Sequence, residues 1–471
     1  MVVSVMSEVP APAFVTAADQ LEALRVRLTG PLLTAGSPAY EEARKTASIV
    51  VDRRPLAIVR AANAEDVVEA VIFARDRGLP LAVRSGGHSV AHHSMVDDAV
   101  VVDLSGMKRV TIDPVTRIAR AEGGATSADI AGPANDFGFA LSTGDTSSVG
   151  MGGLATGGGI GFMVRKYGLT IDNLVSAQVV TAAGEIVTAS AEEHPDLFWA
   201  IRGGGGNFGI VTEFVFRLAP VGQILGGGLI LPANREVLRG YLEYAASAPD
   251  DLTTIAHVMH LPPMPFVPQE RVGELALAIL VCWTGSVEDG ERALAPLRAL
   301  ATPIADLVNP MPYPAIYQFT DHQTAPHGAR IRSMFAHDLS DTTLDATLAA
   351  IENAPSPFSV VQFRALGGAM ARVDANATAF AHRNQRYMVA VIGLWLDPVE
   401  DQAIHEGWTK SLWEAIRQDA SGVYVNFLEN EGTARLLDAY PQATYARLAE
   451  IKRRYDPENL FHFNQNVLPK P

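Results

Sequence analysis

The spacing of hydrophobic and polar residues predicts short strands and a few helices in the first half of the chain. Residues 63–84 predict a helix followed by a short buried strand, because Asn63 can cap a helix start and Gly78 can end a helix. Residues 99–105 predict a second strand, and residues 176–190 predict a hairpin. The first half is therefore expected to be rich in strands.

The character of the sequence changes after Pro220. Glycine clusters stop there, and long strands such as 274–283 alternate with helices such as 287–301. These observations predict a second domain over residues 221–420. Residues 421–471 return to compact, motif-like sequence, and the chain shows no internal repeat.

Composition and charge narrow the class of protein. The chain has 471 residues, of which 48% are apolar and 19% charged, so we expect a globular protein with more than one core. Lys and Arg number 37 against 52 Asp and Glu, and the net charge of -15 disfavours nucleic acid and anionic lipid as partners. The single cysteine, Cys282, excludes intramolecular disulfides and cysteine-based metal clusters.

The distribution of apolar residues bears on localisation. The sequence contains no run of about 18 uninterrupted apolar residues, as a membrane-spanning helix would need. The N-terminal residues MVVSVMSEVPAPAF lack the charged and apolar regions of a signal peptide. We therefore expect a cytoplasmic protein without a membrane partner.

The 40 glycines are concentrated in a few segments. Residues 144–161 hold eight of them, so the backbone there is expected to approach another group closely or to adopt positive φ. Gly204, Gly206 and Gly209 match the dinucleotide-binding pattern, but a helical stretch precedes them and a strand follows. Because that pattern requires the opposite order, a Rossmann NAD site is disfavoured. The chain also has no Walker A sequence and no G-x-S-x-G nucleophile motif.

The sequence RSGGH at residues 84–88 is the most informative local feature. A strand that ends in two glycines leaves backbone N–H groups free to surround an anionic group. Taken alone, a histidine beside glycines is more often a turn or surface residue. His92 and His93 offer further nitrogen ligands, but no matching carboxylates accompany them, so a metal site is not expected.

Five sequence blocks, in the same order, resemble the berberine-bridge-enzyme-like flavoprotein oxidases. The blocks are RSGGHS (84–89), VGMGGLATGGGIG (149–161), RKYGLTIDNL (165–174), HPDLFWAIRGGGGNFGIVTEF (194–214) and YDPENLFHFNQNV (455–467). The resemblance implies an α+β fold, with a two-part FAD-binding domain of the vanillyl-alcohol-oxidase type and a substrate-binding domain whose antiparallel sheet is flanked by helices. The FAD-binding domain would comprise residues 1–220 and 421–471, and the substrate-binding domain residues 221–420.

The resemblance also implies that FAD is bound covalently, with the 8α carbon of the flavin attached to His88. The family's motifs imply cofactor-binding residues in the glycine-rich loops, at the start of one strand and in the C-terminal block. These residues are Arg84, Ser85, Gly86, Gly87, His88, Ser89, His93, Gly144, Thr146, Val149, Gly150, Gly152, Gly153, Gly158, Gly159, Gly161, Gly209, Ile210, Val211, Asn464 and Asn466. No metal ion is implied.

Two positions bear on how the flavin is attached and reoxidised. Members with a second flavin link carry a cysteine where this chain has Thr146, so the comparison implies a single link through His88. Val149 resembles the members that let oxygen reach the flavin.

The motif Tyr-x-Asn-Tyr of many relatives reads Tyr424-Val425-Asn426-Phe427 here, so the tyrosine that acts as a base in those relatives is replaced. Tyr424 and Asn426 are expected on one face of a strand beside the substrate, where they would position the reacting group. Tyr424 could instead be a plain buried aromatic. Arg364 falls near the position of an acid in sugar-oxidising relatives. Its charge could form a cationic subsite for a carboxylate or phenolate substrate, or the residue could be exposed in a structural ion pair.

The resemblance implies an FAD-dependent oxidase that transfers a hydride from a small organic substrate to FAD, with O2 then reduced to H2O2. The substrate would be an amine, an alcohol or a hydroxylated natural product, and an amine is attractive because it can lose hydride without a base. Alternatives are a dehydrogenase with another electron acceptor and a flavin-retaining binding protein with a degenerate site. The implied partners are the substrate and O2, in a monomer or a homodimer.

Overall fold

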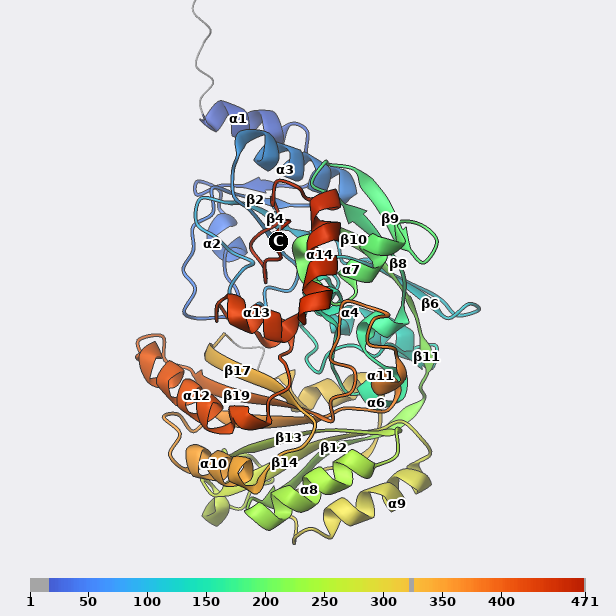
Figure 1. The fold of residues 1–471 in the computed structure, drawn as a ribbon, viewed down its shortest axis with the longest axis vertical. Coiled ribbons are helices and arrows are strands. Elements are labelled where there is room, and N and C mark those ends of the chain that lie inside the picture. Colours follow the sequence, from blue (N-terminus) through green and yellow to red (C-terminus); the bar gives the residue numbers. More distant parts are fainter. Residues whose placement is uncertain (1–16, 322–325, 470–471) are drawn as a thin grey trace, which may run out of the picture.

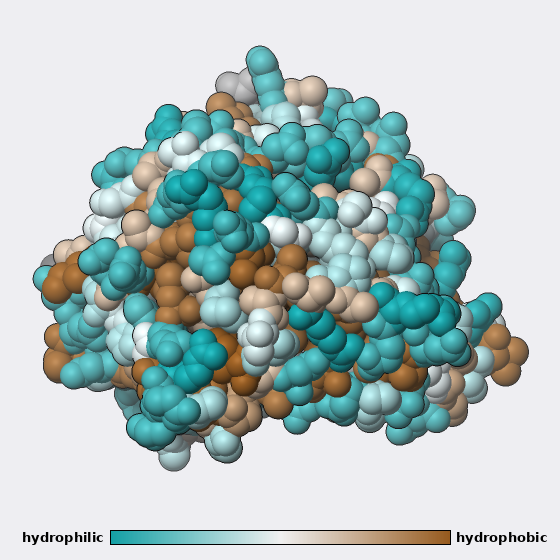
Figure 2. Space-filling view, turned by 90° about the horizontal axis from the view of Figure 1, so that it is seen from below, coloured by the Kyte–Doolittle hydropathy of each residue, from teal (hydrophilic) through white to brown (hydrophobic). Residues whose placement is uncertain are grey.

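The computed structural model describes residues 17–321 and 326–469, so the N-terminal residues considered for targeting lie outside it. Two strand-rich halves lie one above the other, and the last helices of the chain return to the half formed by its beginning (Figure 1). Seen from below, the surface is mainly hydrophilic, with hydrophobic residues showing between the hydrophilic ones (Figure 2). None of the described helices is both long and apolar enough to cross a membrane.

Two main sheets build the half that contains the beginning of the chain (Figure 1). The first has the strand order β1(Leu32–Leu33), β2(Ala57–Arg60), β4(Val100–Asp103), β3(Leu81–Arg84), with β2, β4 and β3 parallel. The second is antiparallel, in the order β5(Val110–Asp113), β6(Ile118–Glu122), β10(Ile210–Arg217), β8(Leu174–Val180), β9(Ile186–Ser190). The predicted hairpin over residues 176–190 is confirmed as β8 and β9.

The helix predicted after Asn63 is confirmed as α3(Ala64–Arg77). The Asn63 side chain accepts a hydrogen bond from the N–H of Asp66, and Gly78 ends the helix in the left-handed region with φ 61°. The helix then leads directly into β3, which carries the chain to the RSGGH loop.

The glycine run at residues 203–206 lies between α7(Pro195–Ile201) and β10. The order is therefore helix, glycines, strand, the reverse of a dinucleotide-binding motif. This arrangement confirms that the pattern formed by Gly204, Gly206 and Gly209 is not a Rossmann site.

An antiparallel sheet of eight strands forms the other half (Figure 1). Its order is β15(Ala305–Asp306), β12(Gln223–Pro232), β14(Leu275–Trp283), β13(Leu252–His260), β18(Val360–Ala365), β19(Tyr387–Trp395), β17(Gly328–Ala336), with β16(Asn309–Pro312) also paired to β12. Four helices cover one face: α8(Arg235–Ser247), α9(Val287–Arg298), α10(Asp341–Glu352) and α12(Gln402–Ile416). This sheet matches the predicted antiparallel sheet flanked by helices, whereas the domain boundaries at 220 and 421 stay a prediction.

The C-terminal helix α14(Gln442–Tyr455) packs on the first half of the chain. Its Lys452 is fully buried and binds the equally buried Asp456 at 2.7 Å. The same ammonium group donates hydrogen bonds to the carbonyl oxygens of Asn207 and Phe461, each at 2.8 Å. Burial lowers the pKa of Lys452, and these three partners compensate for the loss of water.

The strand predicted around Tyr424 and Asn426 is wrong. Residues Val425–Phe427 form a turn of 3-10 helix, and the N–H of Phe427 donates to the carbonyl of Tyr424. The segment still lies along the free edge of β17, where the N–H of Phe335 donates to the carbonyl of Gly422. The Tyr424 side chain points to the glycine-rich loop of the other half, where its hydroxyl accepts a hydrogen bond from the N–H of Gly159.

The dependence of the fold on Lys452 can be measured. Lys452→Met should lower the free energy of unfolding by about 3–5 kcal/mol, because the Asp456 carboxylate would stay buried without its cation. Arg454→Met is a matched control on the same helix, since the Arg454 side chain is 67% exposed and its ion pair with Asp196 should contribute less than about 1 kcal/mol. Urea titration measures both losses, and equal losses would contradict the prediction.

Candidate functional site

The RSGGH loop and the glycine-rich loop interlock through their backbones. A Cβ atom on Gly86 would lie 2.4 Å from the backbone nitrogen of Gly150, and one on Gly150 would lie 2.2 Å from that of Gly86. Ser85 Oγ joins the same contact, because it accepts a hydrogen bond from the N–H of Gly152 at 3.2 Å. Neither Gly86 nor Gly150 can therefore carry a side chain without separating the loops.

His88 stands at this junction. Its Nε2 atom lies 3.0 Å from Ser148 Oγ, and none of the described residues hydrogen-bonds its Nδ1 atom. Burial lowers the pKa of His88, and electrostatic interactions with His327 and Arg84 lower it further. The imidazole is therefore neutral at neutral pH, with a lone pair on one ring nitrogen.

Three further glycines of residues 144–161 approach other groups closely, as predicted. Gly158 faces the Phe380 ring, Gly159 faces Thr170, and Gly161 faces the carbonyl of Thr143. Gly158 and Gly159 also have positive φ. Gly153 differs, because an added Cβ would meet nothing within 4 Å.

Several predicted cofactor residues carry polar atoms without partners. The buried atoms Arg84 Nε, Asn464 Oδ1 and Asn466 Oδ1 have no hydrogen-bond partner, and neither do His92 Nε2 and Ser94 Oγ of the same loop region. Buried polar atoms are normally paired, so a polar ligand is expected beside them. With the open position at Gly153, these residues fit a nucleotide-type cofactor such as FAD.

Four further predicted cofactor residues take two kinds of position. His93 and Ser89 stay in the His88 loop, where His93 Nε2 lies 3.1 Å from Asn430 Oδ1 and the His93 N–H donates to Ser89 Oγ. Ile210 and Val211 begin β10 and are buried in the protein core, at 2% and 5% exposure. Both side chains pack in hydrophobic cores of the first half of the chain.

Tyr424 and Asn426 are brought together at the glycine-rich loop. The Tyr424 hydroxyl accepts hydrogen bonds from the N–H of Gly159 at 2.9 Å and from Asn426 Nδ2 at 3.0 Å. Asn426 Nδ2 also lies 3.3 Å from the carbonyl oxygen of Gly153 and 3.4 Å from that of Leu154. Burial raises the pKa of Tyr424, so the hydroxyl is protonated at neutral pH.

The structure corrects the expectation that Arg364 is exposed. The residue is buried, with 4% of its surface exposed, and its Nη2 atom donates to Asp145 Oδ2 at 2.7 Å, so the expected ion pair is present. Its Nε atom donates to Gln362 Oε1 at 2.6 Å, and its guanidinium lies 5.2 Å from the centre of the Phe427 ring. Because Asp145 neutralises the arginine, the predicted cationic subsite is also absent from the described residues.

Two further polar residues of this region were not predicted. His257 lies on β13, and its Nε2 atom is 2.7 Å from Gln362 Nε2 on β18. Asp145 lies in the glycine-rich segment, but its sequence neighbours do not indicate a partner. Only the pairing of β13 with β18, and the contact between the two halves, bring these side chains to Arg364 and Gln362.

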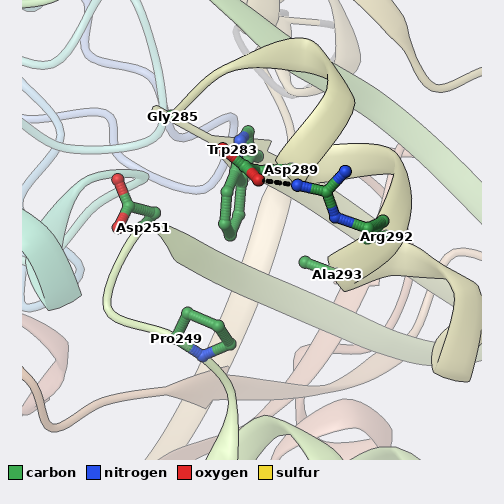
Figure 3. A pocket seen from close by; sticks show the side chains of 7 residues that line it. All are labelled: Pro249, Asp251, Trp283, Gly285, Asp289, Arg292 and Ala293. Atoms are coloured by element: carbon green, nitrogen blue, oxygen red, sulfur yellow. Dashed lines mark hydrogen bonds and ion pairs between the residues drawn. The ribbon is translucent and has the colours of Figure 1, made fainter.

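A separate pocket of about 500 Å³ lies beside α9, at the end of β14 (Figure 3). It is lined by Pro249, Asp251, Trp283, Gly285, Asp289, Arg292 and Ala293. None of the predicted site residues is among them. The pocket is therefore separate from the candidate site.

Comparisons with known proteins identify the family of the chain. A family model described as FAD binding domain matches residues 55–190, and one described as berberine and berberine like matches residues 423–468. The chain is 30% identical over 459 residues to the FAD-linked oxidoreductase YgaK of Bacillus subtilis, which covers 94% of this chain and 98% of YgaK. The chain belongs to the berberine-bridge-enzyme-like FAD-linked oxidoreductases.

Particular relatives are oxidases. The (R)-6-hydroxynicotine oxidase of Paenarthrobacter nicotinovorans is 32% identical over 438 residues, covering 89% of this chain and 92% of that protein. The crystal structure of 6-hydroxy-D-nicotine oxidase from Arthrobacter nicotinovorans has a TM-score of 0.84 at 27% identity, covering 94% of this chain and 98% of that one. A berberine-bridge-like enzyme of Physcomitrella patens has a TM-score of 0.86 at 23% identity, which confirms the fold.

Glu429 anchors the segment of Tyr424 and Asn426 to the eight-stranded sheet. Its Oε1 atom accepts a hydrogen bond from the N–H of Ile331 on β17 at 2.7 Å. Burial raises the pKa of Glu429 to about 7. The carboxyl group is therefore half protonated near neutral pH.

Glu429 should give the protein a measurable pH dependence. Its pKa is about 7 in the folded chain against an ordinary value of 4.5, so the folded state binds the extra proton and stability should fall as pH rises through this interval. Glu429→Gln should remove that part of the slope and should gain most, relative to the parent, above pH 7. Urea unfolding at several pH values tests this, and parallel curves for the two proteins would contradict it.

Proposed function

We propose that the protein is an oxidase that takes a hydride from a small organic substrate, with FAD held covalently through His88 and O2 as the final electron acceptor. When bound, FAD supplies the two-electron acceptor. A C–H bond next to nitrogen or oxygen of the substrate breaks, and the substrate leaves as an imine or a carbonyl compound. The two electrons and two protons end on O2 as H2O2.

The observation that carries this proposal is the position of His88 where the two glycine loops interlock. His88 Nε2 lies 3.0 Å from Ser148 Oγ, and in the tautomer whose Nε2–H donates to that hydroxyl, Nδ1 holds the lone pair that a bond to the flavin 8α carbon requires. The neutral state, which burial favours, keeps that lone pair available at neutral pH. The family membership supports FAD as the group bound there.

A single flavin link is expected. Thr146 offers no thiol, and Cys282 is fully buried on β14 in the other half. Burial raises the pKa of the Cys282 thiol to about 12, so it is not a thiolate at neutral pH. The loop around Thr146 is instead held by side-chain contacts, since Thr143 Oγ1 lies 2.8 Å from the hydroxyl of Tyr317.

Substitution of His88 tests the link. Acid-precipitated parent protein should stay yellow, and a peptide that contains residue 88 should carry the mass of FAD. His88→Ala should release its flavin to the supernatant, because the nitrogen that forms the bond is gone. Cys282→Ser is the control and should retain flavin like the parent. Loss of all colour from the parent on acid treatment would contradict the prediction.

The residues near the reacting group favour a substrate that needs no base. Phe427 has no ionisable group, and the raised pKa of Tyr424 keeps its phenol protonated. The Tyr424 oxygen receives two N–H donors, so the phenol is fixed in orientation. A neutral amine, which can lose hydride without prior proton removal, suits this arrangement better than a sugar hydroxyl.

Asn426 is expected to affect the rate of flavin reduction by holding the Tyr424 hydroxyl in position. Asn426→Ala should slow flavin reduction by roughly 10- to 1000-fold, because it removes the amide that ties Tyr424 to the glycine-rich loop. Flavin content should stay unchanged, since His88 is untouched. Anaerobic stopped-flow absorbance measures the rate with the native substrate. A rate equal to that of the parent would show that the amide has no positioning role.

The oxidase proposal itself is tested by two steps on one sample. Amines, hydroxylated heterocycles, alcohols and sugars are screened anaerobically for bleaching of the flavin. Air is then admitted, and one H2O2 per flavin turnover is expected. Bleaching without peroxide would indicate a dehydrogenase, and no bleaching with any compound would indicate a binding protein.

A further inference from the structure

A short segment of the glycine-rich loop, from Asp145 to Ser148, contacts both halves of the molecule. At one end, Asp145 Oδ2 accepts a hydrogen bond from Arg364 Nη2 on β18 at 2.7 Å. At the other end, Ser148 Oγ lies 3.0 Å from His88 Nε2. The segment contains no helix or strand, so its position depends on these side chains and on the contacts of its backbone.

The backbone of the segment is also held from both sides. The Thr320 hydroxyl donates to the carbonyl of Asp145 at 2.5 Å, and the N–H of Ser147 donates to Asp321 Oδ1 at 3.2 Å. From the first half of the chain, the N–H of Ala128 donates to the carbonyl of Ser147 at 2.9 Å. The half with the eight-stranded sheet therefore helps to place a segment that reaches His88.

Arg364 is the most constrained of the groups that hold the segment. Besides its bond to Asp145, its Nε atom donates to Gln362 Oε1 at 2.6 Å, and its Nη1 atom donates to the carbonyl oxygen of Ile160 at 3.3 Å. The side chains of Arg364 and Asp145 are 5% and 17% exposed, so water hardly competes for the ion pair. Separating such a pair is costly, and the pair therefore fixes Asp145 relative to β18.

Ser148 acts on both the tautomer and the charge of His88. In the tautomer whose Nε2–H donates to Ser148 Oγ, the lone pair is on Nδ1. When Nδ1 forms a bond to carbon, the ring carries a positive charge until Nε2–H loses its proton. Burial lowers the pKa of His88 and so disfavours that charge, whereas a hydrogen bond to Ser148 becomes stronger as the charge develops.

From these contacts we infer that Arg364 and Asp145 are positioning residues for the covalent attachment of FAD to His88. The ion pair holds the segment so that Ser148 meets His88. The bond to the flavin therefore forms efficiently only when the eight-stranded sheet is packed against the first half of the chain. This inference rests on the proposed function, because it takes His88 as the point of attachment.

The attachment step balances with O2 as the oxidant. His88 Nδ1 forms a bond to the 8α carbon, one C–H bond of that methyl group breaks, and Nε2–H loses its proton. The two electrons released pass by way of the flavin to O2. With the two released protons they give one H2O2 for each attachment.

The rate of attachment in the full-length protein tests the role of Ser148. Each protein is produced with little riboflavin and then incubated with FAD in air, and bound flavin is measured by fluorescence after denaturing electrophoresis. Ser148→Ala should slow attachment at least tenfold, whereas Ser148→Thr keeps the hydroxyl and should react like the parent. Ser147→Ala is the matched control, because the contacts of Ser147 given above are made by its backbone. Equal slowing by the two alanine variants would overturn the inference.

Variants of Arg364 test the connection to the sheet. Arg364→Met should slow attachment at least tenfold, and Arg364→Lys, which keeps a cation for Asp145, should restore most of the rate. Arg364→Met combined with Ser148→Ala should be no slower than the slower single variant, because both changes act through one hydrogen bond. Attachment at the parent rate in Arg364→Met, or additive slowing in the double variant, would overturn the inference.

An ion pair elsewhere between the halves separates positioning from a general loss of stability. Lys166 on α6(Val164–Tyr167) binds Asp251 at 2.5 Å. Asp251→Asn weakens that pair and should leave the rate of attachment unchanged. All rates are compared in conditions where urea titration shows that every variant is folded. Equal slowing by Asp251→Asn and Arg364→Met would overturn the inference.

The same measurements distinguish this inference from the proposed function. A parent protein that attaches no FAD, or attaches it at a residue other than His88, would overturn the proposed link and the inference with it. A parent that attaches FAD at His88, together with an Arg364→Met variant that does so equally fast, would keep the link and overturn only the role of the ion pair. Mass spectrometry of the peptide that contains residue 88 identifies the site in each case.

Discussion

The site depends on one backbone contact, between Gly86 and Gly150. The two residues approach so closely that neither can carry a Cβ, and that approach holds the end of β3 against the start of α5(Met151–Gly157). His88 and Ser148 each lie two residues from this contact in sequence, and their side chains meet at 3.0 Å beside it. A side chain at either glycine would separate the loops and move the histidine away from its partner.

A second set of contacts connects this junction to the eight-stranded sheet. Arg364 binds Asp145 of the glycine-rich segment, and the chain after Ser421 lies along the edge of β17. Both contacts involve buried polar groups, which are costly to separate from their partners. They explain how residues from three parts of the sequence keep a fixed geometry around one site, although the loop at Thr146 has no cysteine to form a second flavin link.

Local sequence was informative where short-range physics decides the structure. The capping of α3 by Asn63 and the left-handed Gly78 follow from the preferences of these residues. The helix expected before the 203–206 glycines and the strand expected after them disfavoured a Rossmann site, and the structure has this order. The order of the motifs also indicated the family. The strand expected around Tyr424 was wrong, because the residues form a turn that carries the phenol to Gly159.

The sequence by itself therefore determined the family, the FAD-binding class and the candidate role of His88, because these are carried by contiguous motifs. Only the tertiary structure decided what surrounds them. It showed that Gly86 and Gly150 meet each other, that Arg364 is buried and neutralised by Asp145, and that His257 lies beside Gln362. Such contacts join residues far apart in the chain, and they depend on strand register and on the packing of two halves, which no local pattern encodes.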